Sequence, residues 1–369
     1  MSTRELWVDG LGSPATVPKG AVSSAPDAAR GAYEQAARDT WRPAGMPPAG
    51  RSEAHREIIR YATLAPSSLN SQPWNFRLRA DELLIHPDFT RRMPVTDPDD
   101  EQLFIALGSA AENAHITARA FGMSGDLAYY PVGRGGMKLD LRAAAHIEPS
   151  GLFHAIPRRQ SAAGACDERA PCGRELEVLK RAGDGLSVDI LVVTDRPRIE
   201  KLVEIMRAAH AIQAVDVAFL TERKKWLRFN ERDALHRRDG VYVRCAVGRA
   251  LPRWLGAPLF DLLAGGAADR DEYVRRARSS GGFAVLVGAG RDPRHWVAVG
   301  RACERFLLNA TALNMRTALI NEPIAARAAR IELASCLDLQ SHTPDVLIRF
   351  GYGPASMRSL RRPLERVML

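Results

Sequence analysis

Small polar side chains between two prolines form the stretch whose residue types could do chemistry. Residues 64–76 read Leu-Ala-Pro-Ser-Ser-Leu-Asn-Ser-Gln-Pro-Trp-Asn-Phe, which places Ser67, Ser68, Asn70 and Gln72 close together. Hydroxyl and amide side chains, with exposed backbone amides, can bind a flat or anionic ligand. A polar turn that ends a helix uses the same residue types. The residues alone leave both interpretations open.

The elements on either side indicate how this stretch is positioned. Residues 57–64 carry apolar side chains in helical spacing, and Pro66 ends that helix because it cannot continue the hydrogen-bond ladder. Residues 74–78 alternate like a strand, and residues 82–86 are predicted to pair with it. The polar stretch is therefore expected in a loop between a helix and a strand.

The full string resembles the signature loop of the nitroreductase superfamily of FMN-dependent oxidoreductases. Both prolines, the paired serines, Asn70, Gln72 and Trp74 match. In that family the loop lies against the flavin at a dimer interface. The resemblance implies FMN as cofactor and an α+β, nitroreductase-like fold with central mixed or antiparallel sheets flanked by helices. It also implies that the loop contacts the flavin through Pro66, Ser67, Ser68, Asn70 and Gln72.

A second pattern is an internal repeat. Residues 106–112 (Ala-Leu-Gly-Ser-Ala-Ala-Glu) correspond to residues 298–304 (Ala-Val-Gly-Arg-Ala-Cys-Glu), at an offset of 192 residues. Short apolar helices can coincide by chance, whereas a repeat near half the chain length is also what two fused copies of one module produce. Since nitroreductases are normally interlocked homodimers, the resemblance implies a tandem pseudo-dimer in one chain, closest to the dormancy-associated (Acg-type) branch.

The chain is predicted to divide into an arm and two halves. Residues 1–50 form an N-terminal arm, either a partly ordered tail or a segment that wraps the other half. Residues 51–149 and 150–369 are the two nitroreductase-like halves. Residues 221–282 are the least regular region, predicted as a lid-like or poorly ordered insertion.

Further elements follow from periodicity and capping residues. A helix is predicted from Asp97 as its cap, with Pro98 in the first position, to Phe121. Other helices are expected at 27–40, 153–159, 173–181 and 197–220, and strands at 137–148, 188–193, 283–288, 317–321 and 345–351.

Basic residues in the second half supply the expected phosphate contacts. In the superfamily these come from an Arg-Arg-Ser-like motif and a terminal basic pair, whereas the other subunit supplies the loop. Arg158, Arg159 and Ser161 resemble the first motif, in either of two registers, and Arg361 and Arg362 resemble the second. Guanidinium groups bind a dianionic phosphate in bidentate fashion, although a basic terminal pair also suits plain surface charge. One FMN per chain is expected, because each motif occurs once.

The flavin ring is expected near the end of a second-half strand. The resemblance assigns Ile320, Asn321 and Glu322 to this place, where the related branch tends to carry glutamine instead of Glu322. A carboxylate beside a reduced flavin is unfavourable unless it is protonated or turned away, and a surface position is the alternative. Residues 162–164 (Ala-Ala-Gly) replace the basic residue that usually follows the serine.

The primary functional hypothesis is an FMN-dependent oxidoreductase that passes hydride from NAD(P)H through FMN to a nitroaromatic or quinone-like acceptor. Because the flavin carries the chemistry, no catalytic acid or base is predicted. Two alternatives stay open. One is a protein that stores or sequesters FMN under a lid, and the other is a flavin-dependent dehydrogenase that tailors a biosynthetic intermediate.

Composition narrows the classes of partner. The 369 residues are 46% hydrophobic and 26% charged, as in an ordinary globular protein. The net charge of +9 is spread without interleaved aromatics, so no nucleic-acid partner is expected. Five cysteines without CxxC spacing predict neither a disulfide framework nor a metal site. No signal or membrane segment is evident, and the protein is expected to be cytoplasmic and able to exist as a monomer.

Overall fold

The computed structural model describes residues 25–45, 48, 50–144, 150–162, 164–167, 169–247, 267–340 and 342–369. About half of the predicted N-terminal arm, residues 145–148 of the predicted strand and part of the predicted insertion lie outside the described residues.

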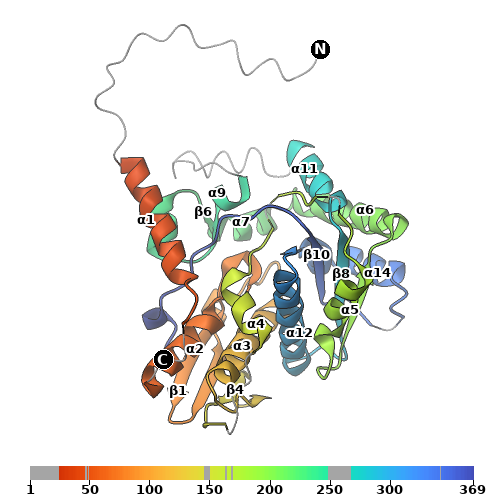
Figure 1. The fold of residues 1–369 in the computed structure, drawn as a ribbon. Coiled ribbons are helices and arrows are strands. Elements are labelled where there is room, and N and C mark those ends of the chain that lie inside the picture. Colours follow the sequence, from red (N-terminus) through yellow and green to blue (C-terminus); the bar gives the residue numbers. More distant parts are fainter. Residues whose placement is uncertain are drawn as a thin grey trace, which may run out of the picture.

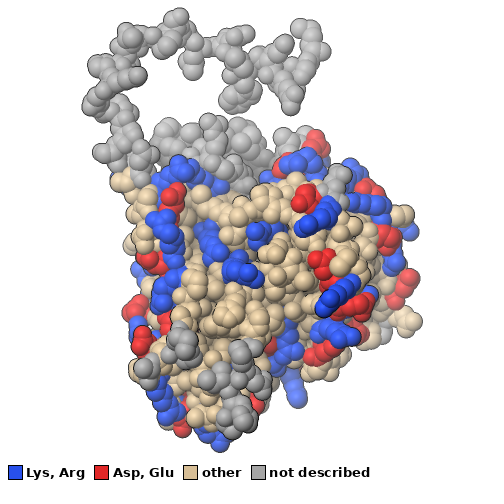
Figure 2. Space-filling model, in the orientation of Figure 1, with Lys and Arg blue, Asp and Glu red and all other residues tan. Residues whose placement is uncertain are grey.

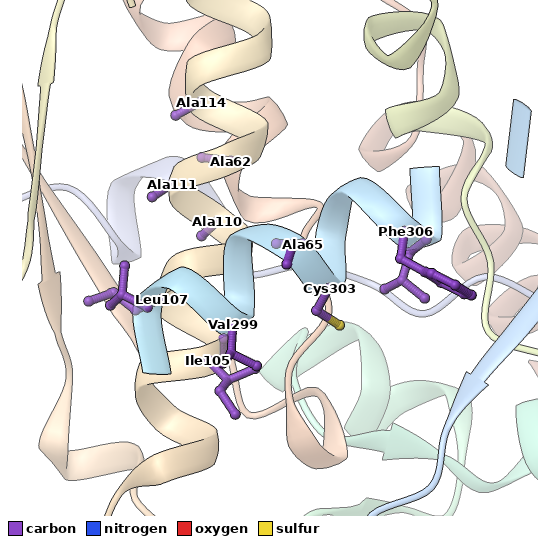
Figure 3. Packing of buried hydrophobic residues seen from close by; sticks show 14 of the residues in the cluster. Ala62, Ala65, Ile105, Leu107, Ala110, Ala111, Ala114, Val299, Cys303 and Phe306 are labelled. Carbon is purple, nitrogen blue, oxygen red and sulfur yellow. The ribbon is translucent and has the colours of Figure 1, made fainter. Parts of the chain in front are cut away.

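Two long helices cross at the centre of the molecule, α3 (Glu101–Ala120) and α12 (Pro293–Ala312) (Figures 1 and 3). A Cβ atom added to Gly108 would collide with the carbonyl oxygen of Val297, and one added to Gly300 would collide with that of Ile105. Only glycine permits so close an approach of two helix backbones. The contact is reciprocal, since both pairs are related by the sequence offset of 192 residues.

Each central helix is associated with a four-stranded sheet. The first sheet has the order β1 (Trp74–Arg79), β2 (Glu82–Pro87), β4 (Met137–Asp140), β3 (Leu127–Tyr129). The second has the order β5 (Val188–Val193), β8 (Gly282–Gly288), β10 (Val346–Gly351), β9 (Arg316–Leu319). All neighbours in both sheets are antiparallel, and each long helix lies between the second and third strands in chain order. Together with the helices, these sheets confirm the predicted α+β class.

Shorter elements surround this framework. The other helices are α1 (Ala25–Thr40), α2 (Arg51–Thr63), α4 (Gly151–Ala155), α5 (Gly173–Lys180), α6 (Arg196–Gln213), α7 (Val217–Lys225), α8 (Glu231–Arg237), α9 (Val243–Val247), α11 (Ala267–Arg278), α13 (Glu322–Ala325) and α14 (Arg327–Cys336). Short 3-10 turns occur at η1 (Ser68–Asn70), η2 (Phe89–Arg91), η3 (Ile156–Arg158), η4 (Arg181–Gly183) and η5 (Leu364–Arg366), and β6 (Leu227–Arg228) pairs with β7 (Val241–Tyr242) in parallel.

The C-terminal segment joins the two sheets. After β10 it crosses the molecule to the first sheet, where the chain ends beside α2 and β1 (Figure 1). The Phe76 amide donates to the Val367 carbonyl at 2.7 Å, and the Leu369 amide donates to the Phe76 carbonyl at 2.8 Å. The largest apolar core likewise takes side chains from both sheets and both central helices, including Phe76, Phe306 and Phe350. The two predicted halves therefore share one core.

Three predicted helices differ clearly from the structure. The one expected at 153–159 is divided into α4 (Gly151–Ala155) and η3 (Ile156–Arg158). The helix expected from Asp97 begins at Glu101, because Asp100 has a left-handed backbone (φ 61°) that no helix interior accepts. The Asp97 carboxylate still accepts the Gln102 and Leu103 amides, both at 3.0 Å. The helix expected at 197–220 is interrupted, and Asp216 starts α7 by accepting the amides of Ala218 and Phe219.

Two other predictions of secondary structure were wrong in part. The strand expected at 137–148 ends at Asp140, within the described residues. The region expected to be least regular, 221–282, contains the end of α7, β6, α8, β7, α9 and α11 in its described parts. Its short helices escaped prediction because each is too brief to show an apolar period.

We expect Gly108→Ala to lower the free energy of unfolding by about 3 kcal/mol, because the new methyl group must push α12 away from α3. Gly31→Ala is the matched control, since Gly31 lies in α1 with open space around it. That change should be neutral or stabilise by up to about 1 kcal/mol. Urea unfolding followed by circular dichroism measures both, and equal stability of the two variants would contradict the close crossing.

Candidate functional site

The signature loop lines a cavity of about 430 Å³. The cavity is bounded by segments from distant parts of the sequence, namely residues 66–70, 159–162, 240–245, 273–277, 318–322 and 357–361, together with Trp41, Met206 and Arg349. Its volume falls in the range of pockets that bind small molecules and cofactors, roughly 300–1,000 Å³. The cavity thus brings a first-half loop against second-half segments.

The loop has an unusual backbone that tertiary contacts hold in place. Leu69, Asn70 and Gln72 have φ angles of 49°, 52° and 53°, which is costly for residues other than glycine. The Asn70 side-chain amide donates to the Gly240 carbonyl at 3.0 Å, and the Gly240 amide donates to the Asn70 carbonyl at 3.1 Å. The Ser67 hydroxyl accepts the Gln72 amide at 2.9 Å. Such strain persists where surrounding structure over-determines it, as at ligand-binding loops.

Three arginines surround one buried ring on the cavity wall. The guanidinium carbons of Arg159, Arg358 and Arg361 lie 5.8, 5.1 and 4.9 Å from the ring centroid of Trp41. The Trp41 indole also donates to the Ser359 carbonyl at 2.8 Å, which fixes the ring. Cation–π attraction offsets part of the repulsion among these three residues, here called the cation cluster.

The cation cluster holds more positive charge than its surroundings neutralise. Burial and the charge of Arg159 lower the pKa of Arg361 to about 9, and the same causes lower the pKa of Arg358. The nearest carboxylate is that of Glu304, whose Oε1 lies 3.7 Å from Arg159 Nε. Burial raises the pKa of Glu304 to about 7, against the opposing effect of Arg159. The cavity therefore presents a field that attracts an anion.

Arg361 also holds the signature loop against the C-terminal segment. Its guanidinium donates to Thr63 O (2.8 Å), Leu64 O (3.1 Å), Ala65 O (3.2 Å), Asn70 Oδ1 (3.0 Å) and Ser359 Oγ (2.7 Å). The first three acceptors are carbonyls at the C-terminal end of α2, which a cation stabilises. Arg159 adds a bond from Nη2 to Leu64 O at 2.8 Å. Arg361 is thus fully engaged by protein acceptors while its charge faces the cavity.

Most of the site residues predicted from sequence lie on this cavity. These are Pro66, Ser67, Ser68, Asn70, Arg159, Ser161, Ile320, Asn321, Glu322 and Arg361. Arg158, Gln72 and Arg362 are not among the lining residues. Arg158, the last residue of η3, is exposed, whereas the next residue, Arg159, is buried. Arg362 donates to Gln72 O at 3.2 Å and pairs with Asp88 at 3.6 Å, on the other side of the loop.

The end of β9 completes the wall opposite the cation cluster. The Asn321 side-chain amide donates to the Ser68 hydroxyl at 2.8 Å and so joins the second half to the loop. The half-buried Glu322 accepts the Tyr273 hydroxyl at 3.4 Å, and its carbonyl accepts the Gln213 amide at 3.0 Å. Burial and the carboxylate of Glu322 raise the pKa of Tyr273, which keeps the phenol neutral.

Several lining residues escaped prediction from sequence. Trp41 is not among the predicted site residues, and nothing in its local sequence indicates that three arginines gather around it. Arg358 gave a weak signal, since it lies shortly before the predicted pair Arg361 and Arg362. Tyr242 belongs to the insertion, and its hydroxyl donates to Glu231 at 2.6 Å.

A second cavity of about 650 Å³ adjoins the first. Both are lined by Ser68, Leu69, Asn321 and Glu322, so the loop and the β9 end separate them. The second cavity also has apolar side chains on its wall, from Leu69, Met93, Phe219, Ile324 and Ala325.

Charged residues of the second cavity are largely neutralised by one another. Glu101 pairs with Arg330 at 2.6 Å and with Arg291 at 3.2 Å. The Asp97 carboxylate accepts two backbone amides at the start of α3, and burial raises its pKa to about 7. The second cavity therefore differs from the first, where the three arginines of the cation cluster have only the carboxylate of Glu304 beside them.

On the face in Figure 2, charged side chains of both signs lie among broad uncharged areas. Among the described residues, no helix is long and apolar enough to span a bilayer. The same residues contain no group of three or more His, Cys, Asp or Glu side chains placed to hold a metal ion.

Comparison with known proteins gives relatives along most of the chain. Two proteins named "Putative NAD(P)H nitroreductase", from two strains of Mycobacterium tuberculosis, are each 25% identical over 335 residues, covering 86% of this chain and 91% of theirs. These relatives support the nitroreductase superfamily for this chain. No protein-family model matches it.

Solved structures that match in part are also nitroreductases. The FMN-dependent nitroreductase NfnB from Mycobacterium smegmatis, in complex with NADPH, is 17% identical with a TM-score of 0.41 and covers 58% of this chain and 96% of its own. A nitroreductase with bound FMN from Bacteroides fragilis is 14% identical with a TM-score of 0.36 and covers 57% of this chain and 95% of its own.

We expect Arg361→Met to lower the free energy of unfolding by about 3 kcal/mol or more, because buried carbonyls lose a charged donor. Arg56→Met is the control, since Arg56 makes an exposed ion pair with Glu365 at 3.1 Å that contributes at most about 1 kcal/mol. Thermal unfolding measures the difference. An Arg361→Met variant no less stable than Arg56→Met would show that Arg361 does not hold the loop.

Proposed function

We propose that this chain is an FMN-dependent oxidoreductase of nitroreductase type, which passes hydride from NAD(P)H to a small acceptor. The observation that carries the proposal is the cation cluster beside the signature loop. Arg159, Arg358 and Arg361 give the first cavity a positive excess that suits a phosphate dianion. The names of the Mycobacterium tuberculosis relatives support the same class of reaction and NAD(P)H as donor.

The residues of the first cavity fit FMN. Arg159 Nε is buried without a hydrogen-bond partner among the described residues, as expected of a donor that awaits an acceptor. Arg159 and Arg358, with the hydroxyl of Ser161, would bind the phosphate. Arg361 has its donors engaged by the loop, and would act through its charge and by positioning Asn70. Arg158 and Arg362 have no place in this site.

The remaining wall would hold the ring system. Ser68 and Asn70 from the loop line this wall together with Asn321 and Glu322, which follow β9 at the start of α13, and with Tyr242 and Tyr273 on adjoining segments. When bound, FMN would accept a hydride from the reduced nicotinamide and deliver electrons to the acceptor. The chain's own contribution is to orient the ring and exclude water. The paired hydrogen bonds between Asn70 and Gly240 help to exclude water, because they hold the segment after α8 against the loop.

The second cavity would receive the acceptor. It adjoins the first at Ser68 and Asn321, and several of its charged residues are paired. An apolar wall with neutralised charges favours an uncharged ring compound, such as a nitroaromatic or a quinone.

The chain is two fused nitroreductase-like halves, as in the dormancy-associated branch. Support comes from the equal strand order of the two sheets, the equal placement of α3 and α12, and the reciprocal contacts of Gly108 and Gly300. One FMN binds per chain, because the signature loop belongs to the first half and all three arginines of the cation cluster belong to the second. A cytoplasmic location and a monomeric state complete the proposal.

Arg358→Met should raise the Kd for FMN about 10- to 100-fold and leave the affinity for riboflavin unchanged, because only FMN carries a phosphate. Arg158→Met is the control, since Arg158 precedes the cluster residue Arg159 but is exposed. Fluorescence titration of the apoprotein gives all the constants. An equal loss of riboflavin affinity, or an effect of Arg158→Met as large as that of Arg358→Met, would contradict the phosphate assignment.

Ala325→Trp should lower kcat/KM for a quinone acceptor at least about tenfold while FMN affinity stays the same, because the indole would fill the second cavity alone. Ala328→Trp adds the same bulk at an exposed position of α14 outside the cavity lining and should have no effect. Steady-state kinetics with saturating NADPH decides. Unchanged kcat/KM in Ala325→Trp would place the acceptor elsewhere.

A further inference from the structure

Two buried glutamates occupy equivalent positions in the central helices. Glu112 lies on α3 and Glu304 on α12, separated by the repeat offset of 192 residues, and both side chains are inaccessible to solvent. A buried carboxylate is stable only when it is paired, hydrogen-bonded or protonated. The two residues meet this requirement differently.

Glu112 is fully paired. One of its oxygens accepts Arg301 Nε at 2.7 Å and the other accepts Arg305 Nε at 2.6 Å. The two arginines lower the pKa of Glu112 against the opposing effect of burial, so this carboxylate stays ionised. Both partners come from α12, across the helix crossing.

Glu304 lacks such partners on α3. The repeat offset places Ser109 and Asn113 where Arg301 and Arg305 stand in the other half. The Ser109 hydroxyl donates to the Gly300 carbonyl at 2.9 Å and does not serve Glu304. Asn113 lies close enough to lower the pKa of Glu304, but neither carboxylate oxygen has a hydrogen bond of regular geometry among the described residues. The exchange of two arginines for neutral residues leaves this carboxylate in need of a cation from elsewhere.

That cation belongs to the first cavity. Glu304 Oε1 lies 3.7 Å from Arg159 Nε, and this nitrogen too lacks a hydrogen-bond partner among the described residues. The distance is that of an ion pair without a hydrogen bond, which leaves Arg159 able to turn its donors to another anion. Glu304 and an anionic ligand in the cavity therefore compete for the guanidinium of Arg159.

We propose that Glu304 is the resident counter-ion of the cation cluster and takes up a proton when a phosphate monoester binds there. The inference rests on the proposed function, since FMN is the monoester that this cavity would hold. It adds a role that the reaction itself does not require, namely that cofactor affinity is coupled to proton uptake by a buried carboxyl group.

The direction of the coupling follows from the groups around Glu304. Burial raises its pKa, whereas Arg159, Asn113 and Arg361 lower it and Glu112 raises it, with a result of about 7. Its helix neighbour Cys303 stays a neutral thiol, because burial raises the pKa of that thiol. A bound dianion would cancel the effect of Arg159 and Arg361, so the pKa of Glu304 would rise further.

The affinity for FMN is therefore expected to fall as the pH rises above 7. Below pH 7 Glu304 is already protonated in the free protein, and binding needs no proton. Above pH 7 the free protein holds the carboxylate, so binding must take up a proton and becomes weaker as the pH rises. The second ionisation of the phosphate, near pH 6, is complete over this range and contributes little.

The test is calorimetric titration of the full-length apoprotein with FMN at pH 8, in two buffers of different ionisation enthalpy. The difference in heat gives the number of protons taken up, expected to lie between about 0.5 and 1 per FMN. Riboflavin, which lacks the phosphate, should take up none. From pH 7 to pH 8, below the pKa of about 9 of Arg361, the Kd for FMN should rise by up to about tenfold.

Glu304→Gln should abolish both effects and bind FMN up to about tenfold more tightly than the parent at pH 8, because the cations then have no internal competitor. Glu112→Gln is the matched control, since it removes the equivalent but fully paired carboxylate, and it should keep the proton uptake of the parent.

The outcomes separate the two proposals. FMN binding by the parent without proton uptake at pH 8 overturns the role of Glu304 and leaves the proposed function intact. Proton uptake that persists in Glu304→Gln also overturns it. Failure of the parent to bind FMN at any pH refutes the proposed function, and the inference with it. Because the parent alone gives the proton count, the test does not depend on how well either variant folds.

Discussion

A buried guanidinium must have its donors satisfied, and Arg361 meets this constraint only where the C-terminal segment lies across the end of α2. Its acceptors there are the carbonyls of Thr63, Leu64 and Ala65, which a helix end leaves free. This single set of bonds fixes the start of the signature loop and brings Arg358 beside Trp41. The site is therefore assembled by the chain's last segment, far in sequence from the loop.

The central helices set the frame in which that assembly is possible. Gly108 and Gly300 let α3 and α12 touch through their backbones. The two sheets share one apolar core, part of which surrounds this crossing (Figure 3). Around this near-symmetric frame the chain is asymmetric. The cations that neutralise Glu112 have no counterpart near Glu304, and the signature loop has none in the described second half. The proposed FMN site therefore lies where the two halves differ.

Local patterns predicted much of this architecture. The strands at 74–79 and 188–193 and the end of α2 before Pro66 follow from alternation and from proline chemistry. The signature loop and Arg159, Ser161 and Arg361 were placed on the same site by resemblance, and the structure brings them to one cavity. Such features are short-range or encoded in a motif, which is why sequence suffices for them.

Other features depend on three-dimensional context. Whether Arg158 or Arg159 turns inward depends on the direction of a single 3-10 turn, which the Arg-Arg pattern cannot specify. The gathering of arginines on Trp41 and the positive φ of Asp100 that delays α3 depend on contacts between distant residues. The second cavity likewise could not be predicted from the sequence, since its wall combines Met93, Phe219 and Ile324 from three separate segments.

Anaerobic rapid mixing of the FMN-loaded protein with NADPH, and separately with NADH, tests hydride transfer most directly when the yellow absorption of the flavin is followed. An oxidoreductase of nitroreductase type predicts rapid bleaching by at least one nucleotide and recovery of the colour when a quinone is added. If neither nucleotide bleaches a flavin that dithionite still reduces, hydride transfer from NAD(P)H is contradicted, and the protein is a store for FMN or a dehydrogenase with a different donor.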